Sequence, residues 1–317
     1  MRQFLLFAAK VTLSALLLYF ALRNTPWAMI AERLANIQFG WMALGIASVF
    51  AQIAFNARRW QIVARHCGAP LDFAYALRLT TIGTFFNQTL PSASGGDAVR
   101  LWLMQRHGAG WQASSYSVLV DRALGLLALA CVVTASLPWS LSLIRDPSGR
   151  FAILTIALIS LTAGLGFLAF GFLNWRWLQN YWPTRHVHAC SRIAWRALRS
   201  SEGGFAVLVS AVIIPVLAVV LAWCMARAIS APASFADLFL LVPPVLLLTM
   251  LPISIAGWGV RESAMVLAFS YAGLAQSDGL IVSLIFGVAL FVVGIVGGIV
   301  WIVTREKNTT LRDIEHP

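Results

Sequence analysis

Charged side chains are scarce in this chain. Asp, Glu, Lys and Arg make up 11% of its 317 residues, whereas soluble globular proteins contain about 25%. Hydrophobic residues account for 60%, and the mean hydropathy is +0.80. This composition excludes an ordinary soluble globule. We therefore expect an all-α, polytopic integral membrane protein with a single membrane domain over residues 1–317.

Paired cysteines and metal-binding motifs are also missing. No CxxC pair occurs, and no histidine lies at metal-ligand spacing from a cysteine. The four cysteines stand singly: Cys67, Cys131, Cys190 and Cys224. His186 and His188 could in principle chelate a metal, but two histidines beside arginines in a loop are more often solvated. The sequence thus indicates no disulfide framework, and we predict no metal site and no cofactor.

Motifs of nucleotide-dependent and metal-dependent enzymes do not occur either, since the chain has no P-loop and no HExxH sequence. We therefore expect no enzymatic activity. The alternative is a membrane-embedded transferase acting on a lipid carrier, in which Asp97 and Asp121 would serve as metal ligands or bases. The net charge of +11 would suit nucleic acid, but the basic residues fall in alternate loops, the pattern that orients membrane spans. We predict no nucleic-acid partner.

Apolar runs long enough to cross the roughly 30 Å hydrocarbon core as helices occur at six places. They lie near residues 4–22, 41–59, 113–137, 151–173, 205–229 and 279–303. The first run has features of a signal peptide, but we expect an uncleaved anchor because Lys10 interrupts it. Most Lys and Arg of the loops face the cytoplasm if the N-terminus lies there. We predict a multi-pass protein of the bacterial inner (plasma) membrane with both termini cytoplasmic.

Two further apolar stretches, residues 73–106 and 236–275, are interrupted by proline and glycine. Their central segments share Leu, Pro, Gly, Val and Arg at matching positions. The expected helix breaks are Pro91, Gly95 and Gly96 in the first segment, and Pro252, Gly257 and Gly259 in the second. Proline removes a backbone donor and clashes with the preceding turn. Each stretch is therefore predicted to be a re-entrant or broken hairpin of two half-helices.

The order of the segments predicts an inverted repeat. Three full spans separate the two broken stretches, so the two hairpins should insert from opposite faces of the membrane. Each copy reads span, hairpin, span, over residues 41–137 and 205–303. In transporters, broken helices in inverted repeats surround a central site that is exposed to each side in turn. Two glycines in the last span, Gly294 and Gly298, indicate a close helix contact, either within the chain or in a homo-oligomer.

Charged residues inside the apolar segments mark the candidate site, because an ionised side chain at the bilayer centre costs about 2.5–3.5 kcal/mol. We expect six of them to converge: Asp97, Arg100, Asp121, Arg122, Arg261 and Glu262. Arginine forks match phosphate oxygens, and helix N-termini attract anions. The arginines are therefore predicted to bind a phosphate-bearing head group, while Asp97, Asp121 and Glu262 balance charge or couple protons. The alternative is a purely structural ion-pair network.

Four more polar residues are assigned local roles, and for Asp97 and Asn87 two roles stay open. Asp97 follows two glycines and could simply complement the start of a helix. Asn87 could bind a substrate hydroxyl group or the backbone freed by the helix break. Arg58 and Arg59 end the second predicted span, where they are expected to be lipid-facing anchors.

These pieces resemble a family that includes the flippase-like membrane region of lysylphosphatidylglycerol synthases and many stand-alone proteins. The resemblance is carried by Arg59-Trp60, by Asn87 through Gly95-Gly96-Asp97 to Arg100, by Asp121-Arg122 with Gly125, and by Pro252 through Gly257-Trp258-Gly259 to Arg261-Glu262. It implies a membrane fold with two re-entrant elements and, for the fused synthases, movement of an aminoacylated phospholipid between leaflets. We expect no synthase activity, because only about a dozen residues follow the last span.

The function expected from these features is a lipid flippase or a transporter of a lipid-linked intermediate. Its partner would be a membrane lipid or a polyprenyl-linked substrate. A solute or ion transporter built on the same inverted repeat is the other alternative to the transferase.

Overall fold

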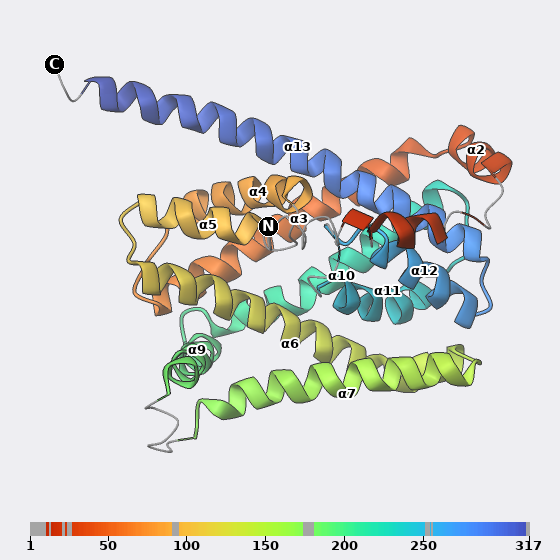
Figure 1. Ribbon diagram of the computed structural model, residues 1–317, viewed down its shortest axis with the longest axis horizontal. Helices are drawn as coiled ribbons and strands as arrows, with labels where there is room; N and C mark the ends of the chain where they lie inside the picture. Colours follow the sequence, from red (N-terminus) through yellow and green to blue (C-terminus); the bar gives the residue numbers. More distant parts are fainter. Residues whose placement is uncertain are drawn as a thin grey trace.

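The computed structural model describes residues 11–12, 14–20, 23, 27–90, 95–173, 181–250, 254 and 256–314, and all regular structure in these ranges is helical (Figure 1). Five helices of the described part are long and apolar enough to cross a membrane. They are α3 (Phe39–His66), α6 (Trp111–Leu143), α7 (Pro147–Phe170), α10 (Gly204–Ala228) and α13 (Gln276–Ile314). They confirm five of the six predicted spans; the first, near 4–22, lies largely outside the described residues.

Both broken stretches fold as helical hairpins. The first pairs α4 (Phe73–Thr89) with α5 (Gly95–Arg106), and the second pairs α11 (Phe235–Thr249) with α12 (Val260–Tyr271). The longest of these helices has 17 residues, and at 1.5 Å per residue it extends about 25 Å, short of the roughly 30 Å core. Each arm is therefore a half-helix, as predicted. Pro91 and Pro252 lie outside the described residues.

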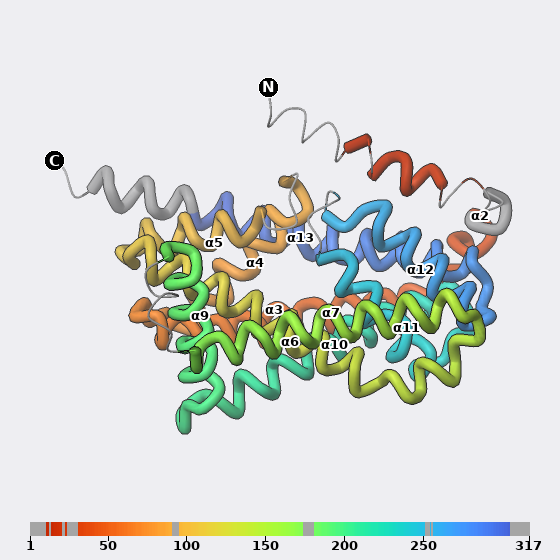
Figure 2. Tube along the Cα trace, turned by 60° about the horizontal axis from the view of Figure 1, so that its bottom comes forward, coloured from red at the N-terminus to blue at the C-terminus, as the bar shows by residue number. Residues whose placement is uncertain are grey.

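The two hairpins point in opposite directions. In Figure 1 the α4–α5 hairpin opens toward the left-hand end of the molecule, and the α11–α12 hairpin opens toward the right-hand end. The helical arms of both hairpins lead toward the middle of the molecule, and the tube in Figure 2 shows the same arrangement. Opposite insertion is the geometry that an inverted pair requires. The duplication of residues 41–137 as 205–303 stays a prediction from the sequence.

The core lies between α3, α10 and the second hairpin. Helix α3 packs along α10, where Gly45 admits the side chains of Leu221 and Met225. Helix α13 packs on α4 through Gly294 and other small residues, with Phe85 of α4 against Gly298. The glycine pair of the last span thus serves a contact within the chain, one of the two alternatives expected from the sequence.

The predicted loop before α10 contains a helix, α9 (Trp182–Arg199). Apolar residues recur at helical spacing, so Cys190, Ile193, Ala194 and Ala197 are buried while the arginines stay outside. The assignment of His186 and His188 to a loop was therefore wrong, because both lie on this helix. The Nδ1 atom of His186 is 2.5 Å from the Tyr116 hydroxyl of α6.

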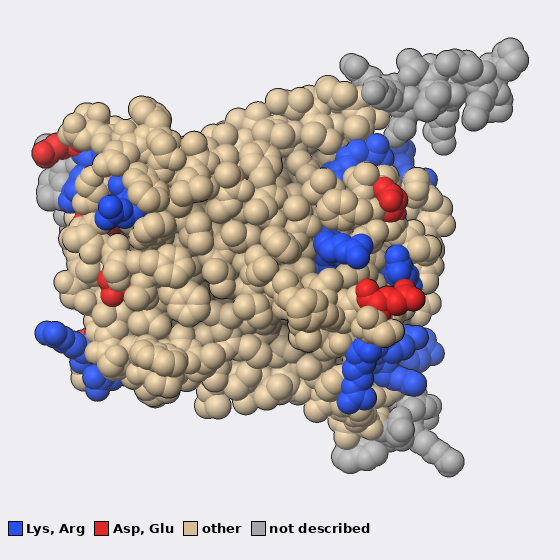
Figure 3. Space-filling view, turned by 180° about the vertical axis from the view of Figure 1, so that it is seen from behind, with Lys and Arg blue, Asp and Glu red and all other residues tan. Residues whose placement is uncertain are grey.

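Charged side chains gather at the two ends of the molecule (Figure 3). On the face shown, a broad belt between the ends carries almost no Lys, Arg, Asp or Glu. Large apolar side chains such as Phe151, Leu158 and Phe205 are exposed on the helices. An apolar belt between charged rims is the surface expected of a protein surrounded by lipid.

Candidate functional site: an arginine-lined cavity

The break between α4 and α5 is held by Asn87. Its Oδ1 accepts a hydrogen bond of 2.8 Å from the backbone N–H of Gly96, in the first turn of α5. Gly96 must lack a side chain, because a Cβ atom there would collide with the carbonyl oxygen of Gly83 on α4. Asn87 therefore binds the freed backbone of the break, which was one of its two expected roles.

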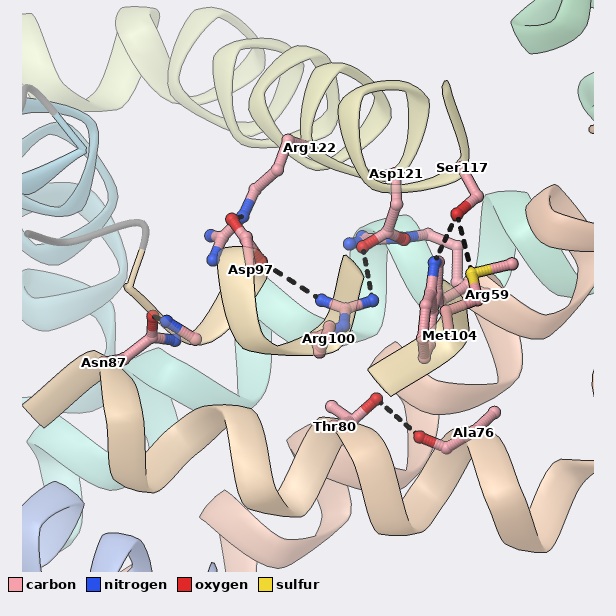
Figure 4. Close-up of polar contacts among 12 residues, drawn as sticks. Arg59, Ala76, Thr80, Asn87, Asp97, Arg100, Met104, Ser117, Asp121 and Arg122 are labelled. Atoms are coloured by element: carbon pink, nitrogen blue, oxygen red, sulfur yellow. Dashed lines mark hydrogen bonds and ion pairs between the residues drawn. The ribbon is translucent and has the colours of Figure 1, made fainter. Parts of the chain in front are cut away.

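Asp97 projects from the first turn of α5 toward two arginines (Figure 4). Its Oδ2 lies 2.6 Å from Nε of Arg122 on α6, and its Oδ1 lies 3.4 Å from Nη1 of Arg100. The carboxylate is buried, and the short contact with Arg122 ties α5 to α6. Asp97 thus joins the ion-pair cluster as well as placing a negative charge at a helix N-terminus.

Asp121 lies deeper in the same cluster and is 1% exposed. Its Oδ1 accepts a hydrogen bond of 2.8 Å from Nε of Arg59 on α3, and its Oδ2 lies 3.6 Å from Nη2 of Arg100. The guanidinium group of Arg100 also stacks 4.0 Å from the ring centre of Trp60. Helices α3, α5 and α6 are thereby joined by one buried network of alternating charges.

The second hairpin carries its own ion pair. Glu262 is fully buried and accepts a hydrogen bond of 2.6 Å from the backbone N–H of Gly259, the N-cap residue just before α12. Its Oε1 lies 2.7 Å from Nη2 of Arg261, and the hydroxyl of Ser283 on α13 donates to the same oxygen. Gly257 and Gly259 have φ angles of +80° and +84°, which favour glycine at this break.

A cavity of about 280 Å³ separates the two hairpins. Three of its lining residues are arginines from different elements, namely Arg59 of α3, Arg122 of α6 and Arg261 of α12. Leu126 and Met250 also line it, and they are 41% and 45% exposed. The cavity therefore has a cationic side with arginines from three helices and an apolar side with exposed Leu126 and Met250.

The predicted convergence is realised in two groups. Asp97, Arg100, Asp121 and Arg122 form one network, whereas Arg261 and Glu262 form a separate pair across the cavity. Arg122, Arg261 and Asn87 line the cavity, and their role in substrate binding stays a prediction. Arg100 does not line it; its guanidinium group is held behind the wall by two carboxylates.

The guanidinium groups on the cavity wall keep free donors. Arg59 and Arg122 each use Nε for a carboxylate, and within the described part of the chain their terminal nitrogens donate no hydrogen bond. Arg261 uses Nε and Nη2, which leaves Nη1. Several unused N–H groups therefore converge on one space, the arrangement that binds an oxyanion with two or more oxygens.

Comparison with known families agrees with this architecture. A family model described as the lysylphosphatidylglycerol synthase TM region matches residues 7–298, nearly the whole chain. The chain belongs to this family. A search of curated proteins found no match. The match confirms the resemblance drawn from the motifs, and it agrees with the all-helical, multi-pass membrane fold.

In this member of the lysylphosphatidylglycerol synthase TM-region family, sequence reasoning placed Arg59 wrongly. It was expected at a span end facing lipid, but α3 continues to His66 and Arg59 is 4% exposed. The adjacent Arg58 is the exposed one. A signal was present: Gln52, Asn56 and Arg59 recur at helical spacing in an apolar run, which places three polar residues on one face. All three line the cavity.

Proposed function

We propose that this protein moves a lipid with a phosphate-bearing head group, or a lipid-linked intermediate, between the leaflets of the bacterial inner membrane. The observation that carries the proposal is the two-sided cavity. Arg59, Arg122 and Arg261 supply donors for phosphate oxygens, and the side with Leu126 and Met250 allows an acyl or prenyl tail to stay in lipid. In the orientation that places most Lys and Arg of the loops in the cytoplasm, both termini would be cytoplasmic.

The opposed hairpins support alternating exposure of the cavity. In broken-helix transporters, one repeat rocks against the other around a site near the bilayer midplane. Here the network around Asp121 belongs to the first hairpin and its neighbours, and the pair of Arg261 and Glu262 belongs to the second. The two groups are not bonded to each other among the described residues. The phosphate would bridge them, and its passage would follow their relative movement.

Head-group translocation in proteoliposomes tests this proposal. Arg122→Gln removes a charge from the cavity wall at a partly exposed side chain, and we expect at least a tenfold slower translocation of acyl-labelled phospholipid. Arg58→Gln is the matched control, because it makes the same change on the outer face of α3. Thermal midpoints of both variants verify folding. Equal rates for Arg122→Gln and wild type would contradict the proposal.

A further inference from the structure

The polar side of the cavity contains cations and amides but no acid. Besides its three arginines it carries four side-chain amides, from Gln52, Asn56, Asn87 and Gln88. Among the described residues that line it, none is Asp or Glu. A cationic head group would therefore find no counter-ion on this wall.

The charges around the cavity do not balance. Among the described residues, four guanidinium groups, those of Arg59, Arg100, Arg122 and Arg261, face three carboxylates, those of Asp97, Asp121 and Glu262. In this described set one positive charge is left inside the bilayer region, where unpaired charge is costly. A ligand with a single negative charge would neutralise it. A phosphodiester carries one such charge, whereas a phosphomonoester or a pyrophosphate carries more.

Two amide atoms point to a hydroxyl group beside the phosphate. Nε2 of Gln52 and Oδ1 of Asn56 are buried and have no hydrogen-bond partner among the described residues. They belong to residues four apart on α3, on the same face as Arg59. One atom is a donor and the other an acceptor, and a hydroxyl group can satisfy both. Buried polar atoms without partners are rare and call for an explanation.

The cavity has room for a small head group. Its volume of about 280 Å³ is many times the roughly 10–15 Å³ that one water molecule needs. That space suits a phosphate with one small polyol or one sugar.

We propose that the cavity selects phosphodiester lipids whose head group is an uncharged, hydroxyl-bearing polyol or single sugar, and that it discriminates against amine-bearing head groups. This inference rests on the proposed lipid transport and specifies its substrate class. It departs from the aminoacylated phospholipid that the family resemblance implied, because that head group adds an ammonium group for which the wall has no partner.

The first experiment compares acyl-labelled phosphatidylglycerol and phosphatidylethanolamine in proteoliposomes of the wild-type protein. Both are phosphodiesters, and only the second carries an amine. We expect phosphatidylglycerol to cross at least tenfold faster. Equal rates, or faster phosphatidylethanolamine, would overturn this inference and leave the proposed transport intact. If no labelled lipid crosses faster than in protein-free vesicles, the proposed transport itself fails and the inference fails with it.

Two further substrates identify the source of the phosphodiester. A polyprenyl-phosphoryl hexose that crosses faster than phosphatidylglycerol would assign the site to prenyl-linked sugars, within the same substrate class. Soluble glycerophosphoglycerol has the same head group without a tail, and we expect no protein-dependent uptake of it. Uptake at the rate of the lipid would overturn the lipid assignment.

Charge variants then test the wall directly. Gln52→Glu and Asn56→Asp each add a carboxylate to the cavity, and we expect each to lower the rate ratio of phosphatidylglycerol to phosphatidylethanolamine at least fivefold. Gln105→Glu is the matched control, because its amide nitrogen is also buried without a partner but lies outside the cavity lining. An unchanged ratio in both folded cavity variants would overturn the inference. If one of these two cavity variants fails to fold, the other still provides the test.

Discussion

Removing the charge of Asp121 is expected to destabilise the protein strongly. Asp121→Asn keeps the shape of the side chain but leaves Arg59 and Arg100 without the carboxylate that lies between them. Among the described residues of this cluster, Asp97 would then be the remaining carboxylate, and it contacts Arg100 and Arg122 but leaves Arg59 unpaired. The loss of one partner from a buried ion pair costs about 3–5 kcal/mol, because the remaining charge is left uncompensated.

This free energy corresponds to a readily measured shift in the thermal midpoint. A loss of 1 kcal/mol lowers the midpoint by about 2–4 °C in domains of 150–250 residues, so Asp121→Asn should lower it by roughly 6–20 °C. The assay is thermal unfolding of the purified protein in one detergent, at a fixed scan rate and at neutral pH. A fixed scan rate matters because unfolding of such proteins is often irreversible.

Glu202→Gln provides the control. Glu202 pairs with Arg65 at 3.5 Å, but the two side chains are 80% and 57% exposed. Exposed pairs contribute about 0–1 kcal/mol, so this variant should melt within a few degrees of wild type. The double variant Asp121→Asn with Arg59→Gln should recover part of the loss, since it removes one of the uncompensated charges. Equal midpoints for Asp121→Asn and Glu202→Gln, or strictly additive losses in the double variant, would refute the argument.

Three more outcomes follow from the geometry. Gly287→Ala should lose about 1–3 kcal/mol of stability together with transport, because its new Cβ would overlap the guanidinium group of Arg261 on the second hairpin. Gly166→Ala is the control, because its new Cβ would meet no atom within 4 Å. This variant should gain about 0.5–1 kcal/mol in the same melting assay. Asn87→Asp should keep its hydrogen bond to the start of α5, yet slow transport of a phosphate lipid about tenfold by repulsion; normal transport would count against an anionic substrate. Burial raises the pKa of the Cys67 thiol to about 12 and that of Cys190 to about 11. Below those values the thiolate fraction rises tenfold per pH unit, so maleimide labelling of both should be slow at pH 8 and accelerate toward pH 10, and fast labelling of the folded protein at pH 8 would contradict their burial.

Much of the fold was predictable because it depends on local composition. Long apolar runs specify spans, and proline with glycine inside two of them specifies the hairpins. Helix α9 was missed because its arginines concealed the apolar stripe through Cys190 and Ala197, which only a periodicity count reveals. Charge content decides whether a run can cross lipid, but spacing decides whether it is helical.

The site was predictable in its residue types but not in its pairing. Intramembrane charges had to find partners, yet the sequence does not show that Arg59 reaches Asp121 while Arg261 keeps the adjacent Glu262. Those distances depend on how α3, α5 and α6 pack. The same packing moves Arg100 behind the wall and brings Gln52 and Asn56 to the front.

Helix α13 touches both hairpins, packing on α4 near Gly298 and on α12 near Gly287. Because α13 contacts both hairpins, a tilt of one hairpin would also push α13 against the other. Independent movement of the two hairpins would require α13 to bend. For the proposed transport we therefore expect the two hairpins to move together, so that the cavity closes to one side as it opens to the other and no continuous pore forms.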